Sequence, residues 1–282
     1  MGTAIIAGRG ALPGHLARAL AARGAEFFVA SLPGADVAAE AEAAGWPHSP
    51  FVVERLAPLM RLLEERGMGE VVFAGAATRA ALDPALIDPA TATLLPALMP
   101  ALAQGDDATL RAVIALFEEA GFGVVGAAEI APDLVPGPGA LGRAVPSDAD
   151  LADIARAAQI VAALGAADLG QGAVVAQGLC LATEALPGTD AMLRFVAQEA
   201  GGLRPDPAGA RGVVFKAPKP GQDRRVDLPA IGPATVAGAR QAGLAGIAFE
   251  AGGVMVLERA ATVAAADAAG LFLWAQGPCG SS

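Results

Sequence analysis

The sequence is poor in lysine, histidine and cysteine. Its 282 residues contain only two histidines and two cysteines, and only two of its 19 cationic residues are lysines. Because His15 and His48 are the only imidazoles and no two cysteines lie close in sequence, we expect no zinc site of the cysteine–histidine type. Cys180 and Cys279 are expected to be ordinary thiols of a cytosolic protein. A site for a hard cation built from aspartates stays open.

Long apolar runs and excess positive charge are also missing. No apolar stretch reaches the ~18 residues that a membrane-spanning helix requires, and the N-terminus lacks the basic segment of a signal peptide. The net charge of -10 argues against nucleic acid as a ligand and against broad electrostatic adhesion to an anionic membrane. It leaves open an apolar docking patch for a lipid. We therefore expect a soluble, cytoplasmic protein.

The order of predicted elements indicates an α/β protein. Hydrophobic residues make up 54% of the chain and charged residues 17%, which is enough to bury a large core. In the first half, strand-like and helix-like segments alternate, and this order predicts a parallel sheet with helices on its faces. The predicted strands are 4–7, 27–30, 71–74 and 122–125, and the predicted helices are 12–22, 54–66 and 107–120.

A stretch rich in proline and glycine, residues 132–146, predicts a linker. Beyond it we predict a helix over 147–164 that Ser147 caps, hairpins of strands 173–176 with 179–183 and 247–249 with 254–257, and a final strand over 271–274. The predicted architecture is an N-terminal Rossmann-like parallel α/β domain (1–131) linked to a C-terminal catalytic mixed α/β domain with hairpins (147–282).

The first glycine-rich turn, Gly8 to Gly14, lies between a predicted strand and a predicted helix. A turn in this place can hold a pyrophosphate, because glycine allows close backbone approach and a helix N-terminus favours anions. A nicotinamide site would need an acidic residue near Ser31, and none is present. Another phosphate or nucleotide contact and a purely structural turn both stay open.

A second candidate, Gly188-Thr189-Asp190, precedes an amphipathic helix. Thr189 or Asp190 could simply cap that helix. Alternatively, Asp190 could face a cleft as a ligand for a metal or a sugar.

The strongest local signal is residues 215–229, the lysine loop, which contains both lysines of the chain, Lys216 and Lys219. Lysine and arginine are not interchangeable at a phosphate, so two lysines in an arginine-rich chain indicate that the compact ammonium matters here. Three prolines stiffen the loop. Asp227 could bind a divalent cation or orient a water molecule. The alternative is a surface loop in which Asp223, Arg224, Arg225 and Asp227 pair with one another.

Taken in order, several motifs resemble the UDP-2,3-diacylglucosamine pyrophosphatases of the LpxI type, which act in lipid A biosynthesis. The resemblance covers almost the whole chain. One departure is visible after the third strand, where the family usually has a lysine in an Ala-Gly-Lys run and this chain has Gly75-Ala76; Arg79 lies nearby but is shifted. The matching segments are 6–13, 105–107, 121–127, 168–171, 188–193, 216–232 and 245–252.

The resemblance implies hydrolysis of UDP-2,3-diacylglucosamine to UMP and 2,3-diacylglucosamine 1-phosphate (lipid X). It also implies a divalent cation, normally Mg²⁺, and a substrate held between two domains. Its essential carboxylate corresponds to Asp227. A lipid substrate implies transient, peripheral contact with the cytoplasmic face of the inner membrane. The residues do not determine the oligomeric state, and a homodimer stays open.

Loop and resemblance together give a hypothesis for each site residue. Asp227 is the expected catalytic residue, as a metal ligand or as the group that orients water, with Asp223 as a second metal ligand. The other expected contacts are with the substrate: Lys216, Lys219 and Arg225 neutralise phosphates, Gln222, Asp190, Thr189 and Gly188 complete the polar shell, and Gly8, Gly10, Leu12 and Pro13 meet the nucleotide. Two rivals remain, a nucleotide-dependent oxidoreductase and a non-catalytic module that binds a phospho-sugar, a lipid or a nucleotide.

Overall fold

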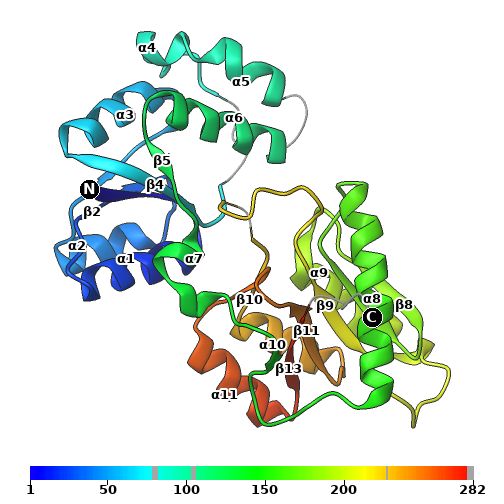
Figure 1. The fold of residues 1–282 in the computed structure, drawn as a ribbon. Coiled ribbons are helices and arrows are strands. Elements are labelled where there is room, and N and C mark those ends of the chain that lie inside the picture. Colours follow the sequence, from blue (N-terminus) through cyan, green and yellow to red (C-terminus); the bar gives the residue numbers. More distant parts are fainter. Residues whose placement is uncertain (78–81, 103–105, 227, 278–282) are drawn as a thin grey trace. The chain divides into compact units, whose positions relative to one another are not determined.

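The computed structural model describes residues 1–77, 82–102, 106–226 and 228–277 (Figure 1). The chain forms two compact units, Met1–Pro132 and Asp133–Ser282. Among the described residues, no helix is both long and apolar enough to cross a membrane.

The N-terminal unit is built on a parallel sheet of five strands in the order β3-β2-β1-β4-β5. Every residue of the central strand β1 and of its neighbour β2 is buried. Such continuous apolar strands are typical of a parallel sheet that is covered on both faces. The strands are β1 (Gly2–Ala7), β2 (Phe27–Ser31), β3 (His48–Pro50), β4 (Met68–Ala74) and β5 (Gly123–Val124).

Helices cover both faces of this sheet. Figure 1 shows α1, α2 and α7 on one side, with α3 and α6 on the other. In α3 the buried residues Leu56, Leu59, Met60 and Leu63 recur at helical spacing, which explains why this segment packs on the sheet. The helices are α1 (Leu12–Ala22), α2 (Val37–Ala44), α3 (Leu56–Glu65), α4 (Pro89–Ala92), α5 (Leu95–Leu102), α6 (Asp106–Glu119) and α7 (Ala127–Ile130), with 3₁₀ turns at Val53–Arg55 and Pro132–Leu134.

The C-terminal unit has a mixed sheet of six strands in the order β6-β13-β11-β9-β7-β8. Strands β9, β11 and β13 are parallel, and β6, β7 and β8 run antiparallel to their neighbours. A short parallel pair, β10 with β12, forms a second sheet. The strands are β6 (Gly139–Ala140), β7 (Gly172–Ala176), β8 (Leu179–Thr183), β9 (Val213–Lys216), β10 (Ala230–Ile231), β11 (Gly246–Glu250), β12 (Met255–Val256) and β13 (Phe272–Gln276).

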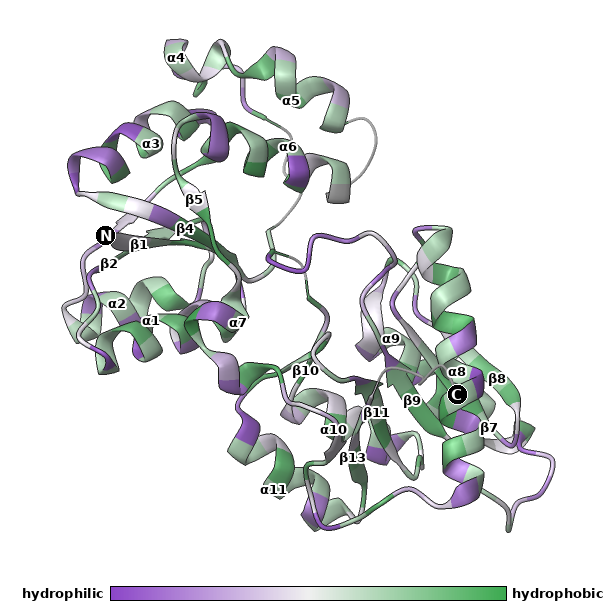
Figure 2. Ribbon diagram, viewed as in Figure 1, coloured by the Kyte–Doolittle hydropathy of each residue, from purple (hydrophilic) through white to green (hydrophobic). Residues whose placement is uncertain are grey.

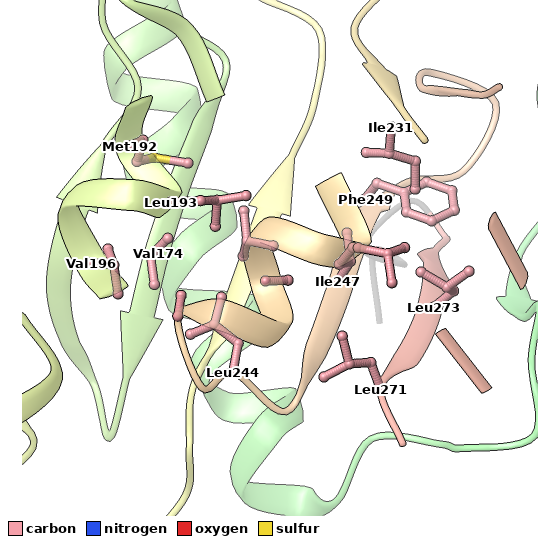
Figure 3. Packing of buried hydrophobic residues seen from close by; sticks show 14 of the residues in the cluster. Val174, Met192, Leu193, Val196, Ile231, Leu244, Ile247, Phe249, Leu271 and Leu273 are labelled. Atoms are coloured by element: carbon pink, nitrogen blue, oxygen red, sulfur yellow. The ribbon is translucent and has the colours of Figure 1, made fainter. Parts of the chain in front are cut away.

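Two apolar clusters fix the helices of this unit on the large sheet. On one face, α8 packs through Ile154, Ala157 and Val161. On the other face, Figure 3 shows Leu193 and Val196 packing near Val174, and Ile247 near Phe249 and Leu273. The helices are α8 (Asp148–Ala166), α9 (Gly188–Phe195), α10 (Pro233–Gln241) and α11 (Arg259–Ala269), with short turns at Val196–Ala200 and Gly201–Leu203.

The α/β fold class with a parallel sheet and a mixed sheet is confirmed. The hairpin of β7 and β8 is also confirmed, and Ser147 caps α8 in a reciprocal bond with Asp150. The second predicted hairpin is wrong. Strand β11 lies between β9 and β13, so both of its edges are occupied, and β12 pairs with β10 instead.

Part of the stretch predicted as a linker belongs to the C-terminal sheet. Residues Gly139 and Ala140 form β6, which pairs with Ala275 and Trp274 at the edge of the sheet. The two-residue length of β6 explains why its sequence shows no strand pattern.

Candidate functional site

Polar residues gather where the parallel strands of the C-terminal unit end. Lys216 is the last residue of β9 and lies beside Phe249 of β11. The last residue of β11, Glu250, lies beside Gln276, the last residue of β13. The antiparallel strand β7 begins at the same edge, where Gly172 is paired with Lys216. Ligands of open α/β sheets bind at the carboxyl ends of the parallel strands. We therefore place the candidate site of this unit at this edge.

Lys216 is buried at the centre of the edge, with 4% of its surface exposed. Its Nζ donates to Thr189 Oγ1 at 2.7 Å and to the carbonyl of Ala230 at 3.3 Å. The carboxylate of Glu184 lies 3.8 Å away. A buried ammonium is rare unless it is paired, because water solvates the charge better than protein does. The Lys216 ammonium is therefore held in a fixed position by its described partners.

The rest of the lysine loop follows β9 and is largely hydrophilic in Figure 2. Lys219 Nζ contacts Asp168 Oδ1 at 2.6 Å, and the Lys219 amide donates to Gln222 Oε1 at 2.9 Å. Gly165 of α8 permits this arrangement, because a Cβ there would lie 2.6 Å from Pro220 Cδ. Lys219 and Pro220 are thus held by contact with Gly165 of α8 and by the charge of Asp168 just after that helix.

Two arginines of the loop form ion pairs. Arg225 binds Asp223 through two nitrogens, with Nη2 2.7 Å from Oδ2 and Nε 3.1 Å from Oδ1. These hydrogen bonds hold the pKa of the Asp223 carboxyl below its usual value. Arg224 Nη1 lies 2.7 Å from Glu250 Oε1. The pairing of Asp223 with Arg225 matches the surface-loop alternative, whereas buried Lys216 does not.

The expected metal ligands are not assembled among the described residues. Asp227 lies outside the residues that the structure describes. Asp223 is paired with Arg225 through both of its carboxylate oxygens. Within residues 1–77, 82–102, 106–226 and 228–277, no group of three or more histidine, cysteine or acidic side chains could hold a metal ion. The described carboxylates therefore do not fit a metal centre by themselves.

Thr189 and Asp190 do not cap α9. The residue at the cap position is Pro187, and no side chain caps the helix, so the capping role that we considered for these two residues is wrong. Thr189 instead accepts the hydrogen bond from Lys216. Asp190 is exposed in the first turn of the helix, and Gly188 adopts a positive φ of 83° just before them.

In the N-terminal unit, the turn after β1 uses its own amides. Gly8 N donates to the carbonyl of Ala74, Arg9 N to that of Ala76, and Gly10 N to Asp36 Oδ2 at 2.6 Å. A Cβ on Gly8 would lie 2.5 Å from the carbonyl oxygen of Ala76. These three amides of the glycine-rich turn are thus engaged within the protein, and Gly8 is explained by close packing.

Leu12 and Pro13 form the first turn of α1, where both are buried. Proline suits this position, because its missing N–H is one that the helix would leave unbonded. Their observed contribution is to the core and to the start of the helix.

Sequence reasoning missed the acidic partners of the lysines. Glu184 follows β8 and has 8% of its surface exposed, and Asp168 is in the left-handed region with φ 54°. Asp36, which binds Gly10, was also missed. An isolated acidic residue at the end of an apolar strand was the available signal for Glu184. That signal does not reveal burial or pairing, which depend on the register of β7 and β8.

Comparisons with known proteins agree with the two units. The model of the LpxI N-terminal domain matches residues 2–134, and the model of the LpxI C-terminal domain matches residues 137–274. The chain belongs to the LpxI family. It is 41% identical over 269 residues to a Caulobacter vibrioides protein named UDP-2,3-diacylglucosamine pyrophosphatase LpxI, and the match covers 95% of each chain.

Two solved structures show a weak likeness to this LpxI family member. A CobK precorrin-6A reductase has a TM-score of 0.34 with 18% identity, over 100% of this chain and 90% of the other. UDP-glucose 4-epimerase of Thermus thermophilus, solved with NAD, has a TM-score of 0.31 with 17% identity, over 100% of this chain and 88% of the other. Likeness at this level supports no conclusion about function.

Proposed function

We propose that this LpxI family member hydrolyses the pyrophosphate bond of UDP-2,3-diacylglucosamine, and that the reaction depends on a divalent cation. The products are UMP and 2,3-diacylglucosamine 1-phosphate. Buried Lys216 carries the proposal: it is a fixed cation at the carboxyl edge of the C-terminal sheet. The name of the Caulobacter relative supports the substrate and the hydrolase activity.

In this proposal the lysine loop binds the two phosphates. Negative charge builds on the phosphoryl and leaving oxygens as water attacks, so cations held in place lower the barrier. Lys216 is already positioned by Thr189. Lys219 and Arg225 would exchange their present partners, Asp168 and Asp223, for phosphate oxygens. Gln222 supports the exchange, because its side chain holds the backbone of Lys219.

Asp227 is the proposed catalytic carboxylate, either as a metal ligand or as the group that orients the attacking water. A bound Mg²⁺ would neutralise phosphate charge and activate water. Asp223 would join Asp227 as a second ligand through the lone pairs that Arg225 does not use. Asp190 and Gly188 remain proposed as part of the polar shell. Gly8, Gly10, Leu12 and Pro13 remain proposed as nucleotide contacts, in which the turn would offer its shape and its helix N-terminus.

An apolar groove beside the site suits the lipid part of this substrate. It has a volume of about 260 Å³ and runs along the segment that joins Glu184 to Thr189. Leu186, in the same segment, has 95% of its surface exposed. We propose that an acyl chain enters the groove while Leu186 contacts the cytoplasmic leaflet of the inner membrane. The groove is lined by Ala182, Thr183, Ala185, Pro187, Gly188, Ala191, Met192 and Phe195.

The test is release of UMP from UDP-2,3-diacylglucosamine in detergent micelles by the full chain, with Mg²⁺ and with EDTA. Release that requires the metal supports the whole proposal. Release that is equal in EDTA would keep the hydrolase activity and reject metal dependence. If folded protein binds the substrate and releases no UMP, it is the non-catalytic binding module instead.

A further inference from the structure

Two acceptor oxygens at the candidate site have no hydrogen-bond partner. They are Glu184 Oε2 and Gln171 Oε1. In the described part of the chain, these are the buried side-chain nitrogen or oxygen atoms without a hydrogen-bond partner. Most buried polar atoms in proteins are hydrogen-bonded, so each exception calls for an explanation. Neither residue has a role in the phosphate chemistry above.

Both residues lie at the same edge of the sheet. Gln171 comes just before β7, and Glu184 comes just after β8, the antiparallel neighbour of β7. The amide of Glu184 donates to the carbonyl of Gly172 at 2.8 Å, and the amide of Ala217 donates to the carbonyl of Gln171 at 3.1 Å. Backbone hydrogen bonds therefore fix both residues next to the strand end that carries Lys216.

The chain makes room for the Glu184 carboxylate. A Cβ on Gly172 would lie 2.5 Å from Oε2, so glycine at this position leaves the oxygen its space. Glu184 has 8% of its surface exposed, and Lys216 Nζ at 3.8 Å is beyond hydrogen-bond distance. A buried carboxylate oxygen without a donor is destabilising, and a donor supplied by a ligand would relieve that cost.

The chemistry of the oxygen limits what that ligand can be. A phosphate offers no proton and would be repelled by a carboxylate, and an acyl chain has no donor. A divalent cation at Oε2 would be disfavoured by the Lys216 ammonium 3.8 Å away. Hydroxyl groups of a sugar are donors that carboxylates accept. In a 2,3-diacylated glucosamine 1-phosphate, the hydroxyls at carbons 4 and 6 are free.

We propose that Glu184 accepts a hydrogen bond from a free hydroxyl, at carbon 4 or 6, of the bound amino sugar, and that Gln171 Oε1 lies in the same sugar subsite. This inference rests on the proposed function for its ligand. The subsite adjoins Lys216, as it must if the sugar and its 1-phosphate bind side by side. Glu184 then selects the sugar, while the lysines bind the phosphates.

The test measures equilibrium dissociation constants of three ligands for the full chain, both as wild type and as a Glu184 variant. The ligands are 2,3-diacylglucosamine 1-phosphate and its 4-deoxy and 6-deoxy analogues. We expect wild type to bind one analogue about 10- to 100-fold more weakly than the parent, because a hydrogen bond to a charged group is lost. In Glu184→Gln, which keeps the side-chain size, this penalty should shrink at least fivefold. Asp206→Asn, at a residue whose backbone binds Gln177 in the turn of the β7–β8 hairpin, is the matched control and should keep the full penalty.

Equal penalties in wild type and Glu184→Gln would overturn the inference and leave Glu184 only as a support for Lys216. So would equal binding of the parent and both analogues to wild type. Release of UMP from UDP-2,3-diacylglucosamine is measured separately with the same protein preparations. If the cycle gives the expected result but no UMP is released, the proposed hydrolysis falls and the sugar subsite stands. If UMP is released but the parent ligand does not bind, the sugar subsite falls and the hydrolysis stands.

Discussion

Replacing Lys216 by methionine should destabilise the C-terminal unit because it leaves Glu184 buried without a cation. The ammonium lies 3.8 Å from Glu184 Oε2. At an effective dielectric constant of about 20, two charges at that separation attract by about 4 kcal/mol. Removing one partner of a buried pair costs about 3–5 kcal/mol. We expect Lys216→Met to lower the free energy of unfolding by about 3 kcal/mol.

Glu184→Gln should cost less, about 1–2 kcal/mol, because Lys216 keeps its bonds to Thr189 and to the carbonyl of Ala230. The double variant should be more stable than the sum of the single effects predicts, by about 2 kcal/mol, because neither Lys216 nor Glu184 then leaves the other as a buried charge. A coupling free energy of this sign and size is expected if the two side chains interact as an ion pair, and it is not expected if each contributes only by packing.

The assay is guanidinium unfolding of the full chain in a Trp46→Phe background. The chain has two tryptophans, so the fluorescence of Trp274 on β13 then reports the C-terminal unit alone. Additive effects of the two substitutions, within about 0.5 kcal/mol, would refute the view that Lys216 and Glu184 act as a charged pair. A loss below about 1 kcal/mol for Lys216→Met would refute it as well.

Three further predictions address the turn, the arginine pair and the lipid contact. Gly8→Ala should destabilise the N-terminal unit by about 2 kcal/mol, because its Cβ would lie 2.5 Å from the Ala76 carbonyl oxygen. The measurement is unfolding followed by Trp46 fluorescence in a Trp274→Phe background. A loss under about 0.5 kcal/mol would contradict the close packing of Gly8 against Ala76. Carboxyl NMR should give Asp223 a pKa below 3.8, and this pKa should rise in Arg225→Ala. Because the pKa of Asp223 is lower in the folded state than in the unfolded state, the pair stabilises the fold above the unfolded pKa. This contribution is lost as the pH falls through the folded pKa. An unchanged pKa in Arg225→Ala would show that the pair is absent in solution. Leu186→Ser should reduce UMP release from substrate in vesicles at least threefold but not in detergent micelles, whereas Leu203→Ser, also exposed, should change neither; equal losses in both media would count against leaflet contact.

Patterns of hydrophobic residues predicted the elements that have a clear period. Helix α1 was predicted with the observed bounds, Leu12–Ala22, because apolar spacing, Pro13 and the preceding glycines agree. Strands β1 and β2 are continuous apolar runs and were also found. Helix α11, with alanine at seven of its 11 positions, was missed because alanine gives little contrast between its faces. The second hairpin failed because pairing is decided by where the whole sheet places β11, which local sequence does not contain.

The candidate site was predicted in part for a similar reason. Lysine is so rare in this chain that Lys216 and Lys219 stand out by residue type alone. The acidic partners, Glu184 and Asp168, belong to segments 30 to 50 residues earlier, and only the register of β7, β8 and β9 brings them to the lysines. The two lysines could be recognised from the sequence because lysine is rare in it. Their acidic partners could not, because their positions depend on pairing between strands that are distant in sequence.

Hydrolysis by the C-terminal unit through Asp227 is the central proposal. The most direct test compares kcat/KM for UMP release from UDP-2,3-diacylglucosamine by wild type, Asp227→Ala and the control Asp206→Ala, all as folded full chains with Mg²⁺. We predict a loss of at least about 100-fold in Asp227→Ala, or about 2.7 kcal/mol of transition-state stabilisation, and less than threefold in the control. Activity of Asp227→Ala within about tenfold of wild type would contradict the account and place the catalytic carboxylate elsewhere.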